Sequence, residues 1–140
     1  MAPRYWIMKT EPNAYSFEDL VREGSTEWDG VRNYQARNNM RAMSVGDLVL
    51  IYHSVGPKEF VGIARVSAEA HPDSTTDDER WECVDVEPVG PLETPVDLAT
   101  VKSDPRLEDI ALVKHSRLSV APLTAGEFRH ILKLGGTKLD

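Results

Sequence analysis

Residues 48–66 read LVLIYHSVGPKEFVGIARV, two apolar segments separated by a Gly-Pro turn. The first segment, 48–54, has no polar residue before His53, a pattern typical of a strand that is covered on both sides, as in a small barrel. The second segment, 59–66, is expected to return beside it as the partner strand of a hairpin. Gly62 lies inside this second segment and marks a bend or a close approach to the backbone.

The remaining elements are expected on both sides of this hairpin. We predict strands at 4–9, 81–89 and 117–120, helices at 16–24, 33–43 and 124–134, and short helices at 97–102 and 107–112. Three prolines (88, 91 and 95) are expected to interrupt regular structure after the 81–89 strand, and Pro122 to end the 117–120 strand. Antiparallel strands with helices segregated to one side or end indicate the α+β class, as an open or partly closed barrel.

Length and composition are those of an ordinary globular domain. The chain has 140 residues, of which 41% are hydrophobic and 28% charged, and no repeat or linker divides it, so we expect one domain spanning 1–140. No apolar run reaches the ~18 residues of a membrane span, and no signal peptide is evident. We therefore expect no membrane association and a cytoplasmic protein, or a nuclear one if the source is eukaryotic. The single cysteine, Cys83, fits a reducing compartment.

The net charge of −7 argues against a protein that coats nucleic acid by bulk electrostatics. The charge is unevenly distributed, however. Residues 31–58 contain Arg32, Arg37, Arg41 and Lys58 against Asp47 alone, which leaves this basic island at +3. Local contact with an anion is therefore possible while the rest of the surface repels it.

Residues 28–38, WDGVRNYQARN, combine rings, amides and guanidinium groups in eleven positions. Asp29-Gly30 is a turn signal, and a helix follows from Asn33. Trp28, Val31 and Tyr34 are core-type residues, yet their neighbours are strongly polar. Two interpretations remain open: a pocket wall with rings to stack on and amides to pair with, or a capped amphipathic helix with a solvated basic face.

Catalytic and metal-binding patterns are weak in this sequence. The four histidines show no metal-ligand spacing among themselves or with Cys83, and there is no Gly-rich phosphate loop or nucleophile elbow, so we expect no metal and no cofactor. His53-Ser54 could be a general base beside a hydroxyl group. The alternative is a strand end whose hydrogen bonds are satisfied.

What remains is a constellation of rings and hydrogen-bonding groups without an obvious nucleophile. Rings are supplied by Trp6, Trp28, Tyr34, Tyr52 and Trp81, of which we assign Trp6 to the core. Polar side chains lie at predicted strand ends or at the start of a helix, where they would gather at a barrel mouth: Lys9, Thr10, Asn33, His53, Ser54, Arg117 and Ser119. Ring stacking combined with amide and hydroxyl pairing is how proteins hold an unstacked nucleobase.

Five segments together resemble the EVE domain: YWIMKTEP at 5–12, the 28–38 motif, Gly46-Asp47 with YHS at 52–54, VGIA at 61–64 and RLSV at 117–120. The resemblance runs from Arg4 to Leu134. It implies a PUA-like fold, a β pseudo-barrel flanked by helices, in the superfamily of the YTH and ASCH domains. It also implies a non-catalytic reader that binds a modified base, a modified cytosine in DNA or a modified RNA base, flipped into a pocket. The implied partners are modified DNA or RNA and restriction or nucleic-acid-processing proteins.

The resemblance carries ten candidate binding residues over by position: Lys9, Thr10, Trp28, Arg32, Asn33, Tyr34, His53, Ser54, Arg117 and Ser119. The sequence departs from the family at residues 73–80, a loop that is shorter than usual and half acidic, so the resemblance does not imply the nucleic-acid contacts of the family's longer loop. Two other classes of function stay open. One is an enzyme acting on a nucleotide or nucleic acid with His53 as base, and the other is a protein–protein adaptor with an exposed apolar patch.

Overall fold

A computed structural model of the chain describes residues 3–139. Its strands are β1 (Tyr5–Thr10), β2 (Thr26–Glu27), β3 (Leu48–His53), β4 (Glu59–Pro72), β5 (Glu82–Asp97) and β6 (Val120–Leu123). Its helices are α1 (Phe17–Glu23), α2 (Tyr34–Arg41), α3 (Leu98–Lys102), α4 (Ala111–Lys114) and α5 (Ala125–Leu134), with a 3₁₀ turn η1 (Pro105–Leu107). The α+β class is thereby confirmed.

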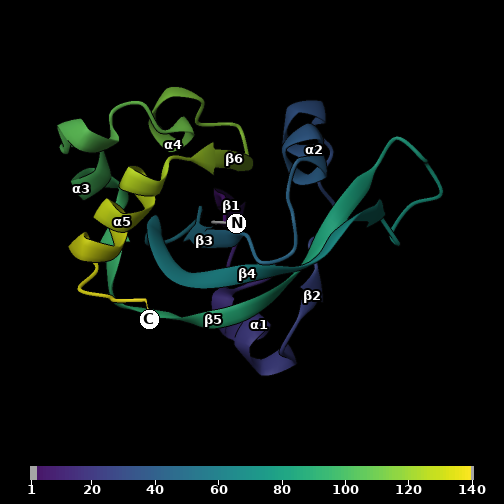
Figure 1. Cartoon of the computed structure of the whole chain (residues 1–140), viewed down its shortest axis with the longest axis horizontal. Coiled ribbons are helices and arrows are strands. Elements are labelled where there is room, and N and C mark those ends of the chain that lie inside the picture. Colours follow the sequence, from purple (N-terminus) through teal and green to yellow (C-terminus); the bar gives the residue numbers. More distant parts are fainter. Residues whose placement is uncertain (1–2, 140) are drawn as a thin grey trace.

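The six strands form one mixed sheet in the order β2-β5-β4-β3-β1-β6. β1 and β3 pair in parallel, and the other neighbouring strands are antiparallel. Register shifts interrupt the β3–β4 and β4–β5 ladders, and such bulges bend the long β4 and β5, whose curvature is visible in Figure 1. Helix α2 packs against both β5 and β6, which lie near opposite ends of the sheet. The helix thus bridges the opening, and the sheet becomes a pseudo-barrel.

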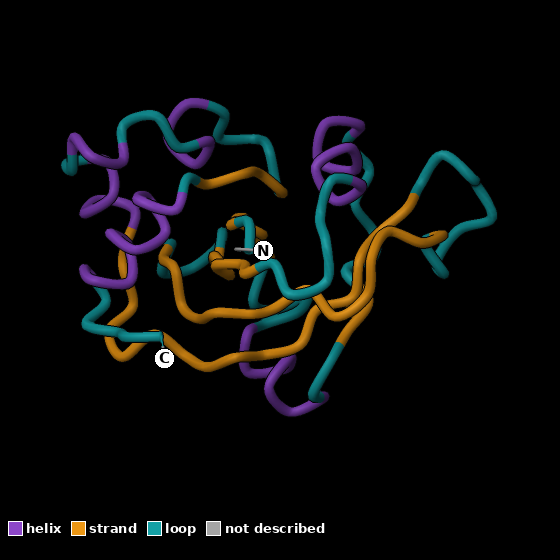
Figure 2. The backbone as a smooth tube through the Cα atoms, viewed as in Figure 1, coloured by secondary structure: helices purple, strands orange, loops and turns teal. Residues whose placement is uncertain are grey.

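Both sides of the central strands are buried. Along β1, Trp6 and Met8 belong to a core cluster that includes residues of α1 and α2, whereas Ile7 belongs to a second cluster built with α3, α5 and η1. β3 alternates in the same way between the two clusters. Figure 2 shows the helices on either side of the strands, with α2 apart from the group formed by α3, α4 and α5. The prediction that residues 48–54 are covered on both sides is confirmed.

Several local signals are also confirmed. Ser16 with Asp19 and Thr124 with Glu127 form complete capping boxes at the starts of α1 and α5. Gly62 is a site of close approach, because a Cβ there would lie 2.4 Å from Cζ of Phe17. A glycine at this position lets the first turn of α1 rest directly on β4.

The proline predictions are wrong in that the strands continue, although two register shifts of the β4–β5 ladder fall at 88–90 and 91–96. β5 continues through Pro88, Pro91 and Pro95, and β6 includes Pro122. The reason is their position at sheet edges, where a missing N–H costs no ladder hydrogen bond. β2 pairs with β5 only at Asp85 and Val86, so no neighbouring strand pairs with that side of β5 at its prolines, and β6 is the last strand of the sheet.

The bounds of several other strands and helices also differ from the predicted ones. The 59–66 strand extends to Pro72, the 81–89 strand begins at Glu82 and reaches Asp97, and the 117–120 strand lies at 120–123. The short helix expected at 107–112 is divided into η1 and α4. Across residues 3–139, no helix is both long and apolar enough to cross a membrane.

Candidate functional site

A cavity of about 570 Å³ opens where β1 ends. Its walls come from the end of β1, the turn before α1, β2 with the segment after it, and the residue before β6. The lining residues are Lys9, Thr10, Glu11, Ala14, Tyr15, Thr26, Glu27, Trp28, Asp29, Gly30, Val31, Arg32 and Ser119. We call this space the β1-end cavity. It brings together five of the ten candidate binding residues: Lys9, Thr10, Trp28, Arg32 and Ser119.

Trp28 is a wall of this cavity and also part of the core. Its side chain is packed in the cluster with α1 and α2, and only 7% of the residue is exposed. The ring meets Tyr15 edge-on, with centroids 6.2 Å apart and an interplanar angle of 88°. Its backbone N–H donates to the carbonyl of Val84 at 2.8 Å, which anchors the segment to β5. The ring is therefore held rigidly at the side of the cavity.

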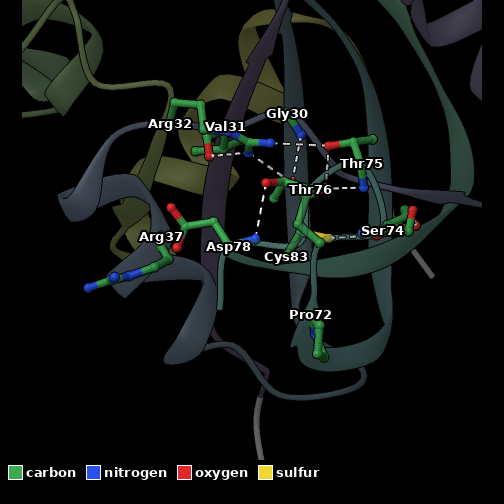
Figure 3. Close-up of polar contacts among 12 residues, drawn as sticks. Gly30, Val31, Arg32, Arg37, Pro72, Ser74, Thr75, Thr76, Asp78 and Cys83 are labelled. Carbon is green, nitrogen blue, oxygen red and sulfur yellow. Dashed lines mark hydrogen bonds and ion pairs between the residues drawn. The ribbon is translucent and has the colours of Figure 1, made fainter. Parts of the chain in front are cut away.

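A buried carboxylate, Asp73, fixes the next part of the wall. Only 2% of Asp73 is exposed, and its oxygens accept hydrogen bonds from the Gly30 amide at 2.9 Å and from the Arg32 guanidinium at 3.0 Å (Figure 3). The amide and the hydroxyl of Thr75 also donate to it, at 2.8 and 2.5 Å. We call these contacts the Asp73 clasp. They join the loop after β4 to residues 30–32.

The clasp also explains the ionisation of Asp73. Burial alone would raise the pKa of this carboxyl, but the hydrogen bonds from Thr75, Gly30 and Arg32 stabilise the carboxylate and lower the pKa to about 2. Asp73 is thus charged at neutral pH and neutralised locally. Asp78, also in the acidic loop, pairs with Arg80 at 2.6 Å. These two carboxylates are therefore engaged within the protein.

Lys9 and Thr10 stand at the end of β1 with their polar atoms partly engaged. The Lys9 ammonium donates to the carbonyl of Ser116 at 2.7 Å, and burial lowers the pKa of Lys9. The backbone N–H of Lys9 donates to the carbonyl of Ser119 at 2.9 Å, which keeps Ser119 beside β1. The Thr10 hydroxyl donates to the carbonyl of Tyr15 at 2.6 Å.

Three acidic residues line the same cavity. Glu27 accepts hydrogen bonds from the amide and hydroxyl of Ser74 at 2.7 and 2.6 Å, and these bonds lower its pKa. For Asp29, burial and then the nearby carboxylates of Asp73 and Glu27 raise the pKa of the carboxyl. Within residues 3–139, the side chains of Asp29 and Glu11 form no hydrogen bond or ion pair, so both can accept hydrogen bonds from a ligand.

Two candidates lie in a different cavity. Asn33 caps α2, with its side-chain oxygen accepting from the Ala36 amide at 2.9 Å. Together with Arg117 it lines a separate cavity of about 550 Å³ between α2, the segment around α4 and β6. The expectation of one common site for all ten residues is therefore not met for this pair.

Tyr34 is not the core residue that the sequence suggested. The residue is 50% exposed and stacks on Trp81, with ring centroids 5.0 Å apart and planes inclined by 23°. The guanidinium of Arg37 lies 4.9 Å from the Tyr34 centroid, and that of Arg32 lies 5.5 Å from the Trp81 centroid. As the first residue of α2, Tyr34 points outward towards the loop before β5. We call Arg32, Trp81, Tyr34 and Arg37 the arginine–aromatic stack.

His53 and Ser54 each form a hydrogen bond with the backbone at a strand end. Nε2 of His53 accepts from the Phe17 amide at 3.2 Å, and burial lowers the pKa of this histidine. The Ser54 hydroxyl donates to the carbonyl of Thr10 at 3.3 Å. Neither residue lines the β1-end cavity. An accepting Nε2 has no free lone pair, so this arrangement does not favour His53 as a general base.

Glu27, His71 and Cys83 place their ligand atoms within 4.8 Å of one another, a proximity that their sequence spacing did not reveal. The Cys83 thiol donates to Glu27 at 3.3 Å, and Nε2 of His71 lies 2.8 Å from a carboxylate oxygen of Asp85. Burial raises the pKa of the thiol, which keeps it protonated. Within the cluster a hydrogen bond thus joins Cys83 to Glu27, whereas His71 is bonded to Asp85 outside it.

Sequence reasoning missed the wall residues Tyr15 and Asp29, and also Asp73, the buried carboxylate that supports the wall. Tyr15 precedes a helix cap and carries no motif, and Asp73 lies in an acidic loop that resembles a solvated surface. Asp29 was noted only as part of a turn. Their role depends on β2 and the loop after β4 meeting near the end of β1, and no local pattern encodes that meeting.

Known proteins share this architecture. The EVE domain family model matches residues 4–134. Human thymocyte nuclear protein 1 is 35% identical over 165 residues, which cover 93% of this chain and 73% of that protein. A crystal structure of an Agrobacterium tumefaciens protein is 47% identical, with a TM-score of 0.94, over 96% of this chain and 94% of that one.

Two further structures contain nucleic acid. The human thymocyte nuclear protein in complex with DNA containing 5-methylcytosine is 33% identical, with a TM-score of 0.89, over 97% of this chain and 99% of that one. The YTH domain of Zygosaccharomyces rouxii MRB1 in complex with N6-methyladenosine RNA is 16% identical, with a TM-score of 0.61, over 99% of this chain and 89% of that one, a likeness in fold alone. The chain belongs to the EVE domain family.

Proposed function

We propose that this chain reads modified nucleobases and takes one flipped base, with 5-methylcytosine in DNA as the leading candidate, into the β1-end cavity. The observation that carries the proposal is the composition of that cavity. A rigid tryptophan and a ring of hydrogen-bonding groups share one space of about 570 Å³. Small-ligand pockets are typically ~300–1,000 Å³ and combine apolar walls with a few placed polar groups.

The relatives support this choice of ligand. The human structure that matches nearly the whole chain is a complex with DNA containing 5-methylcytosine. The YTH likeness adds that the same fold accommodates a methylated base in RNA. A modified RNA base is therefore the second ligand to test.

The arginine–aromatic stack offers a surface for the neighbouring nucleotides. Arg32 belongs to both the stack and the β1-end cavity, so the two are contiguous. Arg32 and Arg41 each pair with a carboxylate, whereas Arg37 has no carboxylate partner among residues 3–139. Exposed rings and an unneutralised guanidinium are the groups that contact bases and phosphates.

Affinity for unmodified duplex should be low. Flipping a base costs a few kcal/mol, and a protein with a net charge of −7 gains little nonspecific attraction to offset that cost. Binding is expected to depend on the modification, because contacts with the modified base inside the cavity must supply the free energy that base flipping costs.

The test is a titration of two duplexes that differ only by one 5-methylcytosine. Ala14 is exposed and lines the cavity, so Ala14→Trp should fill the entrance without disturbing the core. Ala99→Trp, an identical change on the exposed face of α3, is the matched control. We expect the wild type and Ala99→Trp to prefer the modified duplex and Ala14→Trp to lose that preference.

Equal binding of both duplexes by the wild type at physiological salt would refute the proposal for DNA, and the same comparison with methylated RNA would then decide the matter for RNA. Conversion of the nucleic acid, detected by mass spectrometry, would identify an enzyme instead. A reader would act beside restriction or other nucleic-acid-processing proteins. Capture that survives nuclease treatment and Ala14→Trp would identify an adaptor.

A further inference from the structure

A reader of 5-methylcytosine must distinguish it from thymine, which carries the same 5-methyl group. The two bases differ at ring position 4, where cytosine presents an amino donor and thymine a carbonyl acceptor, and at N3. Thymine is abundant in every DNA, so the methyl group alone cannot provide selectivity. Some group in the cavity has to read position 4.

The unpaired hydrogen-bond acceptors of the cavity favour a base that carries an amino group at position 4. Among the three carboxylates that line it, Glu27 is already occupied by Ser74 and Cys83. Asp29 and Glu11 remain without partners in the described chain. An ionised carboxylate accepts hydrogen bonds and cannot donate them, so it pairs with an amino group and repels a carbonyl oxygen.

Asp29 is better placed than Glu11 for this role. It follows the wall residue Trp28 directly, and the backbone on both sides is fixed: the Trp28 amide donates to Val84, and the Gly30 amide donates to Asp73. Its own amide donates to the carbonyl of Glu27 at 2.9 Å. Asp29 lines the cavity while the residue remains exposed, so a ligand can reach its carboxylate. Partial burial and the nearby carboxylates of Asp73 and Glu27 raise the pKa of this carboxyl.

We infer that Asp29 is the specificity residue of the β1-end cavity, accepting a hydrogen bond from the 4-amino group of a flipped cytosine and excluding thymine. The inference rests on the proposed function, because it assigns the base edge that the same cavity reads. In the proposed pose the base lies beside Trp28 and turns its 4-amino group towards Asp29, the next residue of the cavity wall. Thymine in the same pose would place its O4 against the ionised carboxylate, which has no proton to donate to it.

The test uses one duplex with a single variable base opposite guanine: cytosine, 5-methylcytosine or thymine. A thymine opposite guanine is mispaired and easier to flip, so the design favours thymine and a preference against it is informative. The wild type should bind the 5-methylcytosine duplex on the order of 10- to 100-fold more tightly than the thymine duplex. The readout is this ratio of affinities.

Asp29→Asn is the diagnostic variant. Its side-chain oxygen can still accept from the amino group of cytosine, and its NH₂ can donate to O4 of thymine, so the ratio should fall towards one. Asp77→Asn makes the same change at an exposed carboxylate outside the cavity and should keep the wild-type ratio. Since losing a negative charge strengthens binding to all DNA, only the ratio distinguishes the two variants.

Asp29→Ala provides a second variant, which should weaken binding of the 5-methylcytosine duplex selectively. Thermal melts confirm that each protein is folded. An unchanged ratio in folded Asp29→Asn would overturn the assignment while leaving the reader function intact. Failure of the wild type to prefer 5-methylcytosine over cytosine would instead refute the proposed function, and the assignment with it.

Discussion

Replacing Asp73 by Asn should strongly destabilise the protein. The carboxylate accepts from the Gly30 amide, the Arg32 guanidinium and both donors of Thr75. Its pKa of about 2, against a reference value of 3.8, corresponds to about 2 kcal/mol of stability at neutral pH. An Asn side chain also turns its NH₂ towards donors and leaves at least one without an acceptor, so the total loss should be about 3–4 kcal/mol.

The pH dependence has a defined sign. Because the pKa of Asp73 is lower in the folded protein than in the unfolded chain, its stabilisation is fully present above about pH 4 and is lost as the pH falls towards about 2. The difference in unfolding free energy between wild type and Asp73→Asn should therefore narrow by about 1 kcal/mol between pH 7 and pH 3.

Urea unfolding at the two pH values measures both effects. Asp77→Asn is the matched control, because Asp77 lies in the same loop and is exposed. We expect a large drop in the urea midpoint for Asp73→Asn and almost none for Asp77→Asn at neutral pH. Equal midpoints for the two variants, or a difference that does not depend on pH, would refute the structural role assigned to the Asp73 clasp.

Three further changes test other parts of the structure. Trp28→Ala should cost about 3–5 kcal/mol of unfolding free energy because the ring is packed in the core. A thermal melt must therefore accompany any binding assay of this variant, and an unchanged melting temperature would contradict the packing of the ring in the core. Tyr52→Phe should be neutral or stabilise by up to about 1 kcal/mol in urea unfolding, since the buried hydroxyl has no partner within residues 3–139; a clear loss would reveal a missing partner. Arg37→Gln should weaken binding to all DNA sequences alike. It should also reduce the slope of the logarithm of the binding constant against the logarithm of salt concentration by about one, and an unchanged slope would exclude Arg37 from phosphate contact.

The sequence predicted the individual helices and strands better than the contacts between distant segments. The apolar run 48–52 and the capping boxes are local patterns, so the α+β class and the helix starts could be read directly. The cavity depends on contacts between distant segments: Asp73 reaches Gly30 across 43 positions. Trp28 fitted both interpretations of its motif, because a ring on the boundary of the core serves as core and as wall. Tyr34 was misassigned for a related reason, since hydrophobicity does not reveal that a ring at the start of a helix points outward.

The place of β1 in the sheet has a consequence for synthesis on the ribosome. β1 is the first strand made, yet it lies between β3 and β6, and β6 comprises residues 120–123. One edge of β1 therefore stays without its neighbour until most of the chain has been translated. Unpaired apolar edges of this kind favour intermolecular pairing, and long-range closure slows folding. Nascent chains that stop before β6 should thus be the species most in need of chaperones.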